Sequence, residues 1–140
     1  MTTSQVMTSH LSPTERVHTA FDRIAEVDRP EIWITLRSRE DVLADAAAVQ
    51  DRVAAGEDLP LAGVTVAVKD NVDVAGLPTT AACPEYAYTP ELTAPAVARL
   101  VAKGAVVLGK TNLDQFATGL VGTRSPYGAV RSAWDDTRVS

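Results

Sequence analysis

The sequence predicts an α/β fold, and three observations support this prediction. Two short apolar segments rich in β-branched residues, 64–68 and 105–108, have the composition of buried strands. A helix predicted at 95–103 connects them, and a strand–helix–strand order is typical of parallel strands with a right-handed crossover. Two amphipathic helices precede the first strand. Because two parallel strands do not form a stable sheet, the sheet is predicted to be incomplete within this chain.

The first predicted helix begins at Ser12 and ends at Val27. Ser12 can cap the helix, Pro13 suits its first turn, and Glu15 completes the spacing of a capping box. Apolar residues follow at helical spacing, at Val17, Phe21, Ile24 and Val27. Pro30 ends the helical pattern, because proline disfavours helical geometry in the residue before it.

A second helix is predicted from Ser38 to the residues before Gly56, which is a typical C-terminal glycine. Its apolar stripe consists of Val42, Ala46, Val49 and Val53. The two helices are expected to lie antiparallel, as a cover or an arm, with an apolar connection that contains Trp33, Ile34 and Leu36. The predicted organisation is therefore a helical N-terminal arm, 1–56, followed by the start of an α/β domain, 57–140.

Loops are predicted for two long stretches of the α/β part. Residues 69–94 are rich in Pro, Thr, Gly and Asp, and loops of that length are usually functional or covering segments. Residues 121–140 also have the composition of a loop, and a short helix is predicted within 112–119. Gly104 is expected to end the helix that starts near Pro95.

The composition excludes several classes of protein. With 46% hydrophobic and 22% charged residues, the 140-residue chain suits one modest domain and is neither disordered nor of low complexity. A net charge of −5 with scattered basic residues disfavours a nucleic-acid partner. No apolar run approaches the ~20 residues of a membrane span, and the N-terminus does not resemble a secretory signal. A single cysteine fits a reducing, cytoplasmic location.

Residues 104–111, GAVVLGKT, match the pattern of a phosphate-binding loop, in which Lys110 would contact phosphate. In such a loop the middle residues leave the strand, and their N–H groups surround the phosphate. Here the four middle residues are the predicted strand itself, so their N–H groups are expected to pair within the sheet. We therefore interpret the match as a coincidence, and expect neither nucleotide binding nor a role as a base for Lys110.

Lys69 is the charged residue best placed for chemistry. It follows the first predicted strand directly, and in parallel α/β sheets ligands bind at the carboxyl ends of strands. Burial there would favour the neutral amine, which can act as a base, whereas the simpler alternative is a lysine paired with Asp70. Cys83 is interpreted as a small buried residue, and His10 and His18 as surface residues. With two histidines and no CxxC pair, no metal site is predicted.

The sequence from Pro60 onward resembles the amidase signature family. The family pattern P-L-x-G-x-x-x-x-V-K-D-N-x-x-x-x-G fits residues 60–76, and the family's T-T pair fits residues 79–80. The likeness continues through GKTN at 109–112 and LDQFA at 113–117, where the family commonly has M-D-E-F-A. The resemblance implies a mixed β-sheet covered by helices, of which this chain holds the N-terminal portion.

Within the family, residues 114–128 look most like allophanate hydrolases, which cleave allophanate to ammonia and carbon dioxide. The resemblance implies a hydrolase for a C–N bond in a small-molecule amide, with no cofactor and no metal. A general amidase and the amidase subunit of the glutamyl-tRNA amidotransferase remain alternatives, although Gln115 and Arg124 favour the allophanate type. A short paralogue that acts as an interaction module is the non-catalytic alternative.

The family's catalytic triad is Ser–cis-Ser–Lys, and Lys69 matches its lysine. The Gly/Ser-rich signature, which supplies both serines and the oxyanion donors, has no counterpart in this sequence, and Ser125, Ser132 and Ser140 match neither serine. Lys69 would be a base without a nucleophile, so the chain is expected to be inactive alone. Its incomplete sheet would leave apolar surface exposed, for the remainder of an amidase domain or a second copy to cover.

Overall fold

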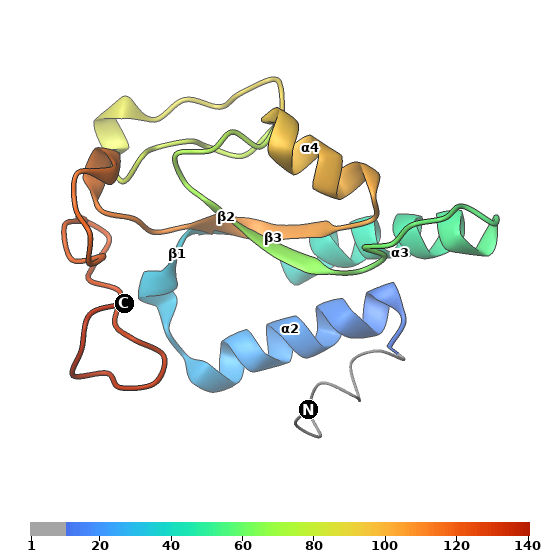
Figure 1. Ribbon diagram of the computed structural model, residues 1–140, viewed down its shortest axis with the longest axis horizontal. Helices are drawn as coiled ribbons and strands as arrows, with labels where there is room; N and C mark the ends of the chain where they lie inside the picture. Colours follow the sequence, from blue (N-terminus) through green and yellow to red (C-terminus); the bar gives the residue numbers. More distant parts are fainter. Residues whose placement is uncertain (1–10) are drawn as a thin grey trace. The chain divides into compact units, whose positions relative to one another are not determined.

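The computed structural model describes residues 11–140 and shows an α/β fold with a three-stranded sheet (Figure 1). The strands, in the order β1-β3-β2, are β1 (Trp33–Leu36), β2 (Thr65–Lys69) and β3 (Val106–Thr111). The α-helices are α2 (Pro13–Val27), α3 (Arg39–Ala54) and α4 (Pro95–Ala102). Short 3-10 helices are η2 (Pro30–Ile32), η3 (Pro84–Tyr86) and η4 (Gln115–Ala117). The predicted fold class is confirmed.

The central strand, β3, pairs with one neighbour in each orientation, so the sheet is mixed. β1 runs antiparallel to it. On the other side, the Val106 N–H donates to Val64 O and the Asp70 N–H donates to Thr111 O. Residue numbers therefore rise together along β2 and β3, which makes these two strands parallel. The predicted pair of neighbouring parallel strands, connected through helix α4, is confirmed.

The chain divides into two compact units. The first contains the described residues up to 28, together with 37–66 and 98–108. The second contains residues 29–36, 67–97 and 109–140. Strands β2 and β3 each give their first residues to the first unit and their last residues to the second.

In the first unit, helix α2 packs against helix α3. Both helices begin at a serine whose hydroxyl accepts an N–H bond from the third helical residue, Ser12 from Glu15 and Ser38 from Asp41. The Glu15 carboxylate accepts the Ser12 N–H in return, which completes the predicted capping box. The buried apolar side chains of the two helices are Val17, Phe21, Val42, Ala46 and Val49. Both predicted helices are confirmed.

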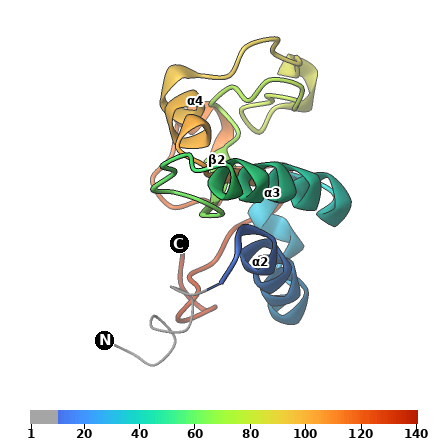
Figure 2. The ribbon, with the colours of Figure 1, turned by 90° about the vertical axis from the view of Figure 1, so that its right-hand side faces the viewer.

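The strand segments of the first unit lie between helices. Helix α2 and residues 98–102 of α4 lie on opposite sides of these segments in both views (Figures 1 and 2). Gly63 allows a close approach here: its φ is +71°, and a Cβ atom at this position would lie 2.4 Å from Pro13 Cα. Only a residue without a side chain fits this position, so the glycine of the PLAG sequence, residues 60–63, is required by packing on α2.

In the second unit, β1 pairs with the end of β3, with Thr35 opposite Lys110 and Leu36 opposite Gly109. No regular element is predicted from the sequence for residues 33–36. They form a strand because the end of β3 offers a partner. Gly109 makes the close pairing feasible, since a Cβ atom there would lie 2.2 Å from Thr35 O.

Two local predictions are wrong, one about burial and one about secondary structure. The strand predicted at 64–68 is not buried along its length, and Val68 is the only fully buried residue of β2, because β2 is an edge strand of this sheet. The helix predicted within 112–119 is limited to the short η4, because Phe116 and Ala117 have left-handed φ values of 52° and 57°.

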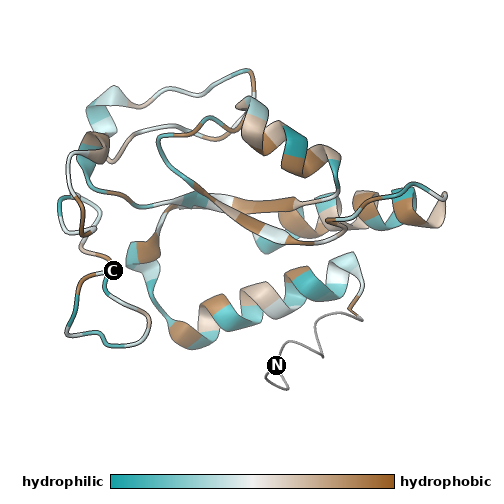
Figure 3. Cartoon of the chain, viewed as in Figure 1, coloured by the Kyte–Doolittle hydropathy of each residue, from teal (hydrophilic) through white to brown (hydrophobic). Residues whose placement is uncertain are grey.

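Several large apolar side chains are exposed in the loops of the second unit, as predicted. Figure 3 shows the hydropathy of each residue along the backbone, with apolar residues in brown. Leu92 is 81% exposed, Leu120 97% and Trp134 99%. The association that such exposure would promote stays a prediction. Within residues 11–140, no helix is both long enough and apolar enough to cross a membrane.

Candidate functional site

The segments that carry the family resemblance come together in the second unit. VKDN at 68–71, the threonine pair at 79–80, GKTN at 109–112 and DQFA at 114–117 all belong to it. Hydrogen bonds and one buried ion pair join these segments across long separations in sequence. The ends of two neighbouring strands and the loops that follow them therefore form one polar cluster.

Lys69 is the last residue of β2, and its side chain is exposed. The Lys69 carbonyl accepts the Val72 N–H at 2.9 Å, so the chain turns immediately after the strand. Asp70, the next residue, is fully buried. The burial that would favour a neutral Lys69 amine is absent within the described residues. The predicted alternative, a Lys69–Asp70 pair, is also wrong, because Asp70 pairs with a different lysine.

That other lysine is Lys110, the second-last residue of β3, and its side chain is 0% exposed. Its Nζ lies 3.0 Å from Asp70 Oδ1 and donates hydrogen bonds to Pro78 O and Thr79 Oγ1, both at 3.1 Å. Two hydrogen bonds and one ion pair therefore surround the ammonium group. Among residues 11–140, Asp70 Oδ1 accepts no hydrogen bond, so the Lys110 charge alone compensates this oxygen.

The other carboxylate oxygen of Asp70 holds a tight turn. Asp70 Oδ2 accepts the Thr80 N–H at 2.9 Å and also the Thr80 hydroxyl. Thr80 Oγ1 in turn accepts the Ala82 N–H at 3.1 Å. Ala81 and Ala82 are buried and have left-handed φ values of 50° and 61°. Because left-handed geometry costs free energy in residues other than glycine, the polar contacts hold a turn that the chain would not adopt alone.

The turn is also tied to the segment that follows β3. The Gln115 side-chain amide donates to Ala82 O at 3.0 Å, and the Phe116 N–H donates to Ala81 O at 2.9 Å. The DQFA sequence therefore supports the same turn that Asp70 supports from β2.

A buried carboxylate, Asp114, organises the loop after η4. Its oxygens accept the backbone N–H groups of Arg124 at 2.7 Å, Gly122 at 3.1 Å and Val121 at 3.2 Å. The hydrogen bond from Arg124 contributes most, and with those from Gly122 and Val121 it holds the pKa of Asp114 below its ordinary value. The loop at 121–124 is thus wrapped around a negative charge.

The side-chain amide of Asn112 links the loop at residues 125–128 to Glu31. It donates to Glu31 O and Gly128 O, both at 3.0 Å, and its Oδ1 accepts the Ser125 hydroxyl at 2.6 Å. Ser125 therefore has a role in holding the loop.

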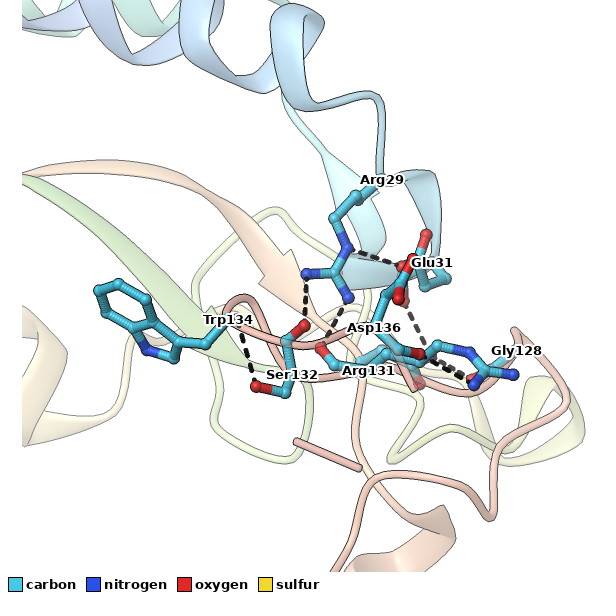
Figure 4. Close-up of polar contacts among 8 residues, drawn as sticks. Arg29, Glu31, Gly128, Arg131, Ser132, Trp134 and Asp136 are labelled. Carbon is cyan, nitrogen blue, oxygen red and sulfur yellow. Dashed lines mark hydrogen bonds and ion pairs between the residues drawn. The ribbon is translucent and has the colours of Figure 1, made fainter. Parts of the chain in front are cut away.

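The last part of the chain is held by Arg29 (Figure 4). Its guanidinium donates to Arg131 O at 2.6 Å and contacts Glu31 at 3.1 Å. The Ser132 hydroxyl accepts the Trp134 N–H at 3.2 Å, and the indole ring of Trp134 points away from these contacts (Figure 4). Ser132, like Ser125, is used in local loop structure.

The remaining residues singled out from the sequence do not join the cluster as ligands or nucleophiles. His18 is exposed on α2, as predicted, and His10 lies outside the described residues. Cys83 is half-buried rather than buried, with its Sγ 3.5 Å from Glu85 Oε2. In the part of the chain that the structure describes, no three His, Cys, Asp or Glu side chains converge in a way that could hold a metal ion.

The interpretation of GAVVLGKT as a strand is confirmed. Gly104 ends α4 with a φ of +98°, and residues 106–111 are β3. The Val106 N–H is used in the sheet, and the Lys110 ammonium already has its three partners. Sequence reasoning missed the pairing of Lys110 with Asp70. The available signal was their placement: opposite charges that follow or end two strands predicted to be parallel neighbours lie at the same edge of a sheet.

Comparison with known proteins finds a matching family and several similar proteins. The Amidase family pattern matches residues 15–140. Urea amidolyase of Saccharomyces cerevisiae is 53% identical over 117 residues, which cover 84% of this chain and 6% of that protein. A glutamyl-tRNA(Gln) amidotransferase subunit of Deinococcus radiodurans is 39% identical over 135 residues, covering 96% of this chain and 28% of that protein.

A solved structure has the same fold. Allophanate hydrolase of Kluyveromyces lactis superposes with a TM-score of 0.78 at 45% identity, covering 96% of this chain and 22% of that one. The chain spans less than a third of the length of each of these three proteins. Since the family pattern covers nearly all of the described residues and the relatives share its motifs and fold, this chain belongs to the amidase family.

Proposed function

We propose that this chain supplies the catalytic lysine, Lys69, of an amidase that hydrolyses a C–N bond in a small amide, with allophanate as the substrate. The observation that carries the proposal is the position of Lys69 in VKDN, at the carboxyl end of a parallel strand. The identities of 53% to a urea amidolyase and 45% to an allophanate hydrolase support the choice of substrate.

The proposed chemistry uses Lys69 as the final proton acceptor. A nucleophilic serine attacks the amide carbon, and its proton passes through a second serine to the neutral Lys69 amine. The proton returns to the leaving nitrogen, which departs as ammonia, and water then releases the acyl group from the serine. In this proposal both serines come from outside the present sequence, because Ser125 and Ser132 hold loops.

The ion pair formed by the residue next to Lys69 is compatible with a role of Lys69 as a base. Among the described residues, Lys69 forms no ion pair, while the neighbouring Asp70 carboxylate is compensated by Lys110. A carboxylate paired with Lys69 would favour the ammonium form, which cannot accept a proton. The pairing of Asp70 with Lys110 therefore leaves Lys69 available.

The proposal also covers the partner, the cellular location and the type of substrate of the enzyme. The exposed apolar side chains, such as Leu120 and Trp134, support a further part of an amidase domain or a second copy as the partner. The single cysteine supports a cytoplasmic location, and the net charge of −5 supports a small molecule rather than nucleic acid as the substrate.

The test is substitution of Lys69 in the complete protein encoded by the open reading frame that includes this chain. Lys69→Ala is expected to lower kcat for ammonia release from allophanate by about 10²–10⁴-fold, because it removes the general base. Lys69→Arg should be no better, since a guanidinium stays protonated. Lys103→Ala, at an exposed lysine, is the matched control, and circular dichroism checks folding. Substantial activity in Lys69→Arg would show that Lys69 is only a structural charge.

The amidase subunit of a glutamyl-tRNA amidotransferase is the second candidate. It is supported by 39% identity to the Deinococcus radiodurans amidotransferase over 96% of this chain. The two candidates differ in substrate, so the complete protein should release ammonia from allophanate and not from glutamine if the first is correct.

A further inference from the structure

We propose that Asp70 and Lys110 are positioning residues for the amidase reaction, whose buried ion pair fixes the end of β2 against the turn at residues 79–82. The pair would thereby hold the backbone of Lys69 in place. This inference rests on the proposed function of Lys69 and adds two residues that do not touch the substrate.

Asp70 follows Lys69, and each of its four polar atoms has a partner. Its N–H donates to Thr111 O at 3.0 Å, and its carbonyl accepts the Ala81 N–H at 3.1 Å. Its Oδ2 accepts from Thr80, and its Oδ1 faces the Lys110 ammonium. The end of β2 is therefore fixed by β3 on one side and by the turn on the other.

The charge of Lys110 compensates the buried Asp70 carboxylate. Asp70 Oδ1 has no hydrogen-bond donor among the described residues, so a neutral side chain at position 110 would leave a buried carboxylate oxygen uncompensated. The same ammonium reaches Pro78 O and Thr79 Oγ1, which begin the turn. Lys110 thus binds the strand end and the turn at once, which a hydrophobic residue of equal volume could not do.

The turn at residues 79–82 is strained. Ala81 and Ala82 have left-handed φ values, and Thr80 links them to Asp70 through its hydroxyl. If the pair is broken, the buried Asp70 carboxylate loses its counter-charge, and the contacts that hold the geometry of the turn are weakened. A shift of about 1 Å in a catalytic group costs about 10²-fold in rate. The consequence for Lys69 would then be a loss of kcat without a matching change in substrate affinity.

The experiment compares four variants of the complete protein: Lys110→Met, Asp70→Asn, the combination of both, and Lys103→Met as a matched control at an exposed lysine. Two quantities are measured at a temperature where each variant is folded by circular dichroism. The first is kcat and KM for allophanate, and the second is amide hydrogen exchange at residues 79–82.

Each single variant is expected to lower kcat by about 10²-fold with little change in KM, and to speed exchange at residues 79–82. Asp70→Asn keeps the shape of the side chain, so it tests the inference if Lys110→Met does not fold. The combined variant should recover only part of the loss of Lys110→Met, because it leaves no buried charge unpaired but still lacks the contacts of the ammonium with Pro78 O and Thr79 Oγ1. Lys103→Met should behave as the unmodified protein.

A folded single variant with unchanged kcat would overturn the inference, since the pair would then be structural only. It would also be overturned if kcat fell while exchange at residues 79–82 stayed unchanged. Failure of the proposed function gives a different result: Lys69→Ala would keep its activity. The exchange measurement does not depend on activity, so it would still report whether the pair holds the turn.

Discussion

Lys69 and Lys110 lie near the carboxyl ends of two neighbouring parallel strands, but their surroundings are opposite. Lys110 belongs to β3, which has β1 on one side and β2 on the other, and its side chain is fully buried. Lys69 belongs to the edge strand β2, and its side chain is exposed. The same residue type therefore becomes an internal cation on the central strand and an available amine on the edge strand.

This comparison shows how sheet position separates structure from chemistry. A buried ammonium must be compensated, and Lys110 is compensated by Asp70 and two oxygen acceptors. Lys69 is exposed and forms no ion pair among the described residues, so its amine is not committed to a structural contact. Removing the two lysines should therefore have different consequences: removal of Lys69 should cost activity alone, whereas removal of Lys110 should cost stability as well.

The largest expected effect tests this difference directly. Lys110→Met should lower the free energy of unfolding by about 3–5 kcal/mol, because it leaves the Asp70 carboxylate buried without a counter-charge. Lys69→Met, at an exposed side chain, should change it by less than about 0.5 kcal/mol. Urea unfolding of the complete protein measures both. Equal losses would break the comparison.

The next prediction contrasts the strands themselves. Gly109→Ala should destabilise the protein by about 1–3 kcal/mol, because the new Cβ would lie 2.2 Å from Thr35 O and would separate β1 from β3. Ala67→Val, at an exposed position of β2, should stay within about 0.5 kcal/mol of the unmodified protein. The same unfolding measurement applies, and a neutral Gly109→Ala would show that the central strand is less confined than its contacts indicate.

A third prediction extends the comparison to the loop after β3. The pKa of Asp114 is lowered in the folded state, chiefly by the Arg124 N–H, so its carboxylate stabilises the fold above the ordinary aspartate pKa of about 3.9. This contribution is lost as the pH falls through the lower, folded value. Asp114→Asn should therefore be less stable than the unmodified protein at pH 7, and the deficit should disappear in strong acid.

The control for this pH dependence is Asp136→Asn, at an exposed aspartate in the last loop. It should show no such pH-dependent deficit. A deficit in Asp114→Asn that is the same at every pH would mean that shape, and not the charge of the carboxylate, holds the loop at 121–124.

The smallest expected effect lies in the loop after β2. The Tyr88 hydroxyl donates to Asp73 at 2.7 Å, and this hydrogen bond raises the pKa of Tyr88 above its ordinary value, with burial adding to the shift. Its contribution to stability is complete below the ordinary tyrosine pKa of about 10 and is lost as the pH rises through the folded value. In an absorbance titration, Asp73→Asn should lower the pKa of Tyr88, whereas Glu85→Gln should leave it unchanged.

The helices could be predicted because their signals are local. Ser12, Glu15 and Ser38 cap their helices within three residues in sequence, and the apolar stripes of α2 and α3 coincide with their buried residues. The first half of β3 could also be predicted, because residues 105–108 are all apolar, whereas its extension through residues 109–111 could not. Strand β1 could not, because four residues become a strand only when a partner far along the chain pairs with them.

The candidate site also has features that could be predicted from the sequence and features that could not. The position of Lys69 at the end of a strand follows from the sequence, but its exposure depends on which strand forms the edge of the sheet. The burial of Lys110 could not be read from GKT, because that pattern says nothing about the Asp70 carboxylate that compensates it. The left-handed turn at Ala81 and Ala82 was hidden for a related reason, since alanine gives no local signal for it.

The order of strands in the sheet has a consequence for synthesis on the ribosome. The central strand β3 is the last of the three to be made, so β1 and β2 emerge without a partner. At ~5–20 residues per second, Leu36 waits about 4–15 s before Gly109, its partner on β3, is synthesised. During that interval we expect both nascent strands to present unpaired backbone edges, which chaperones can bind and which other chains can capture.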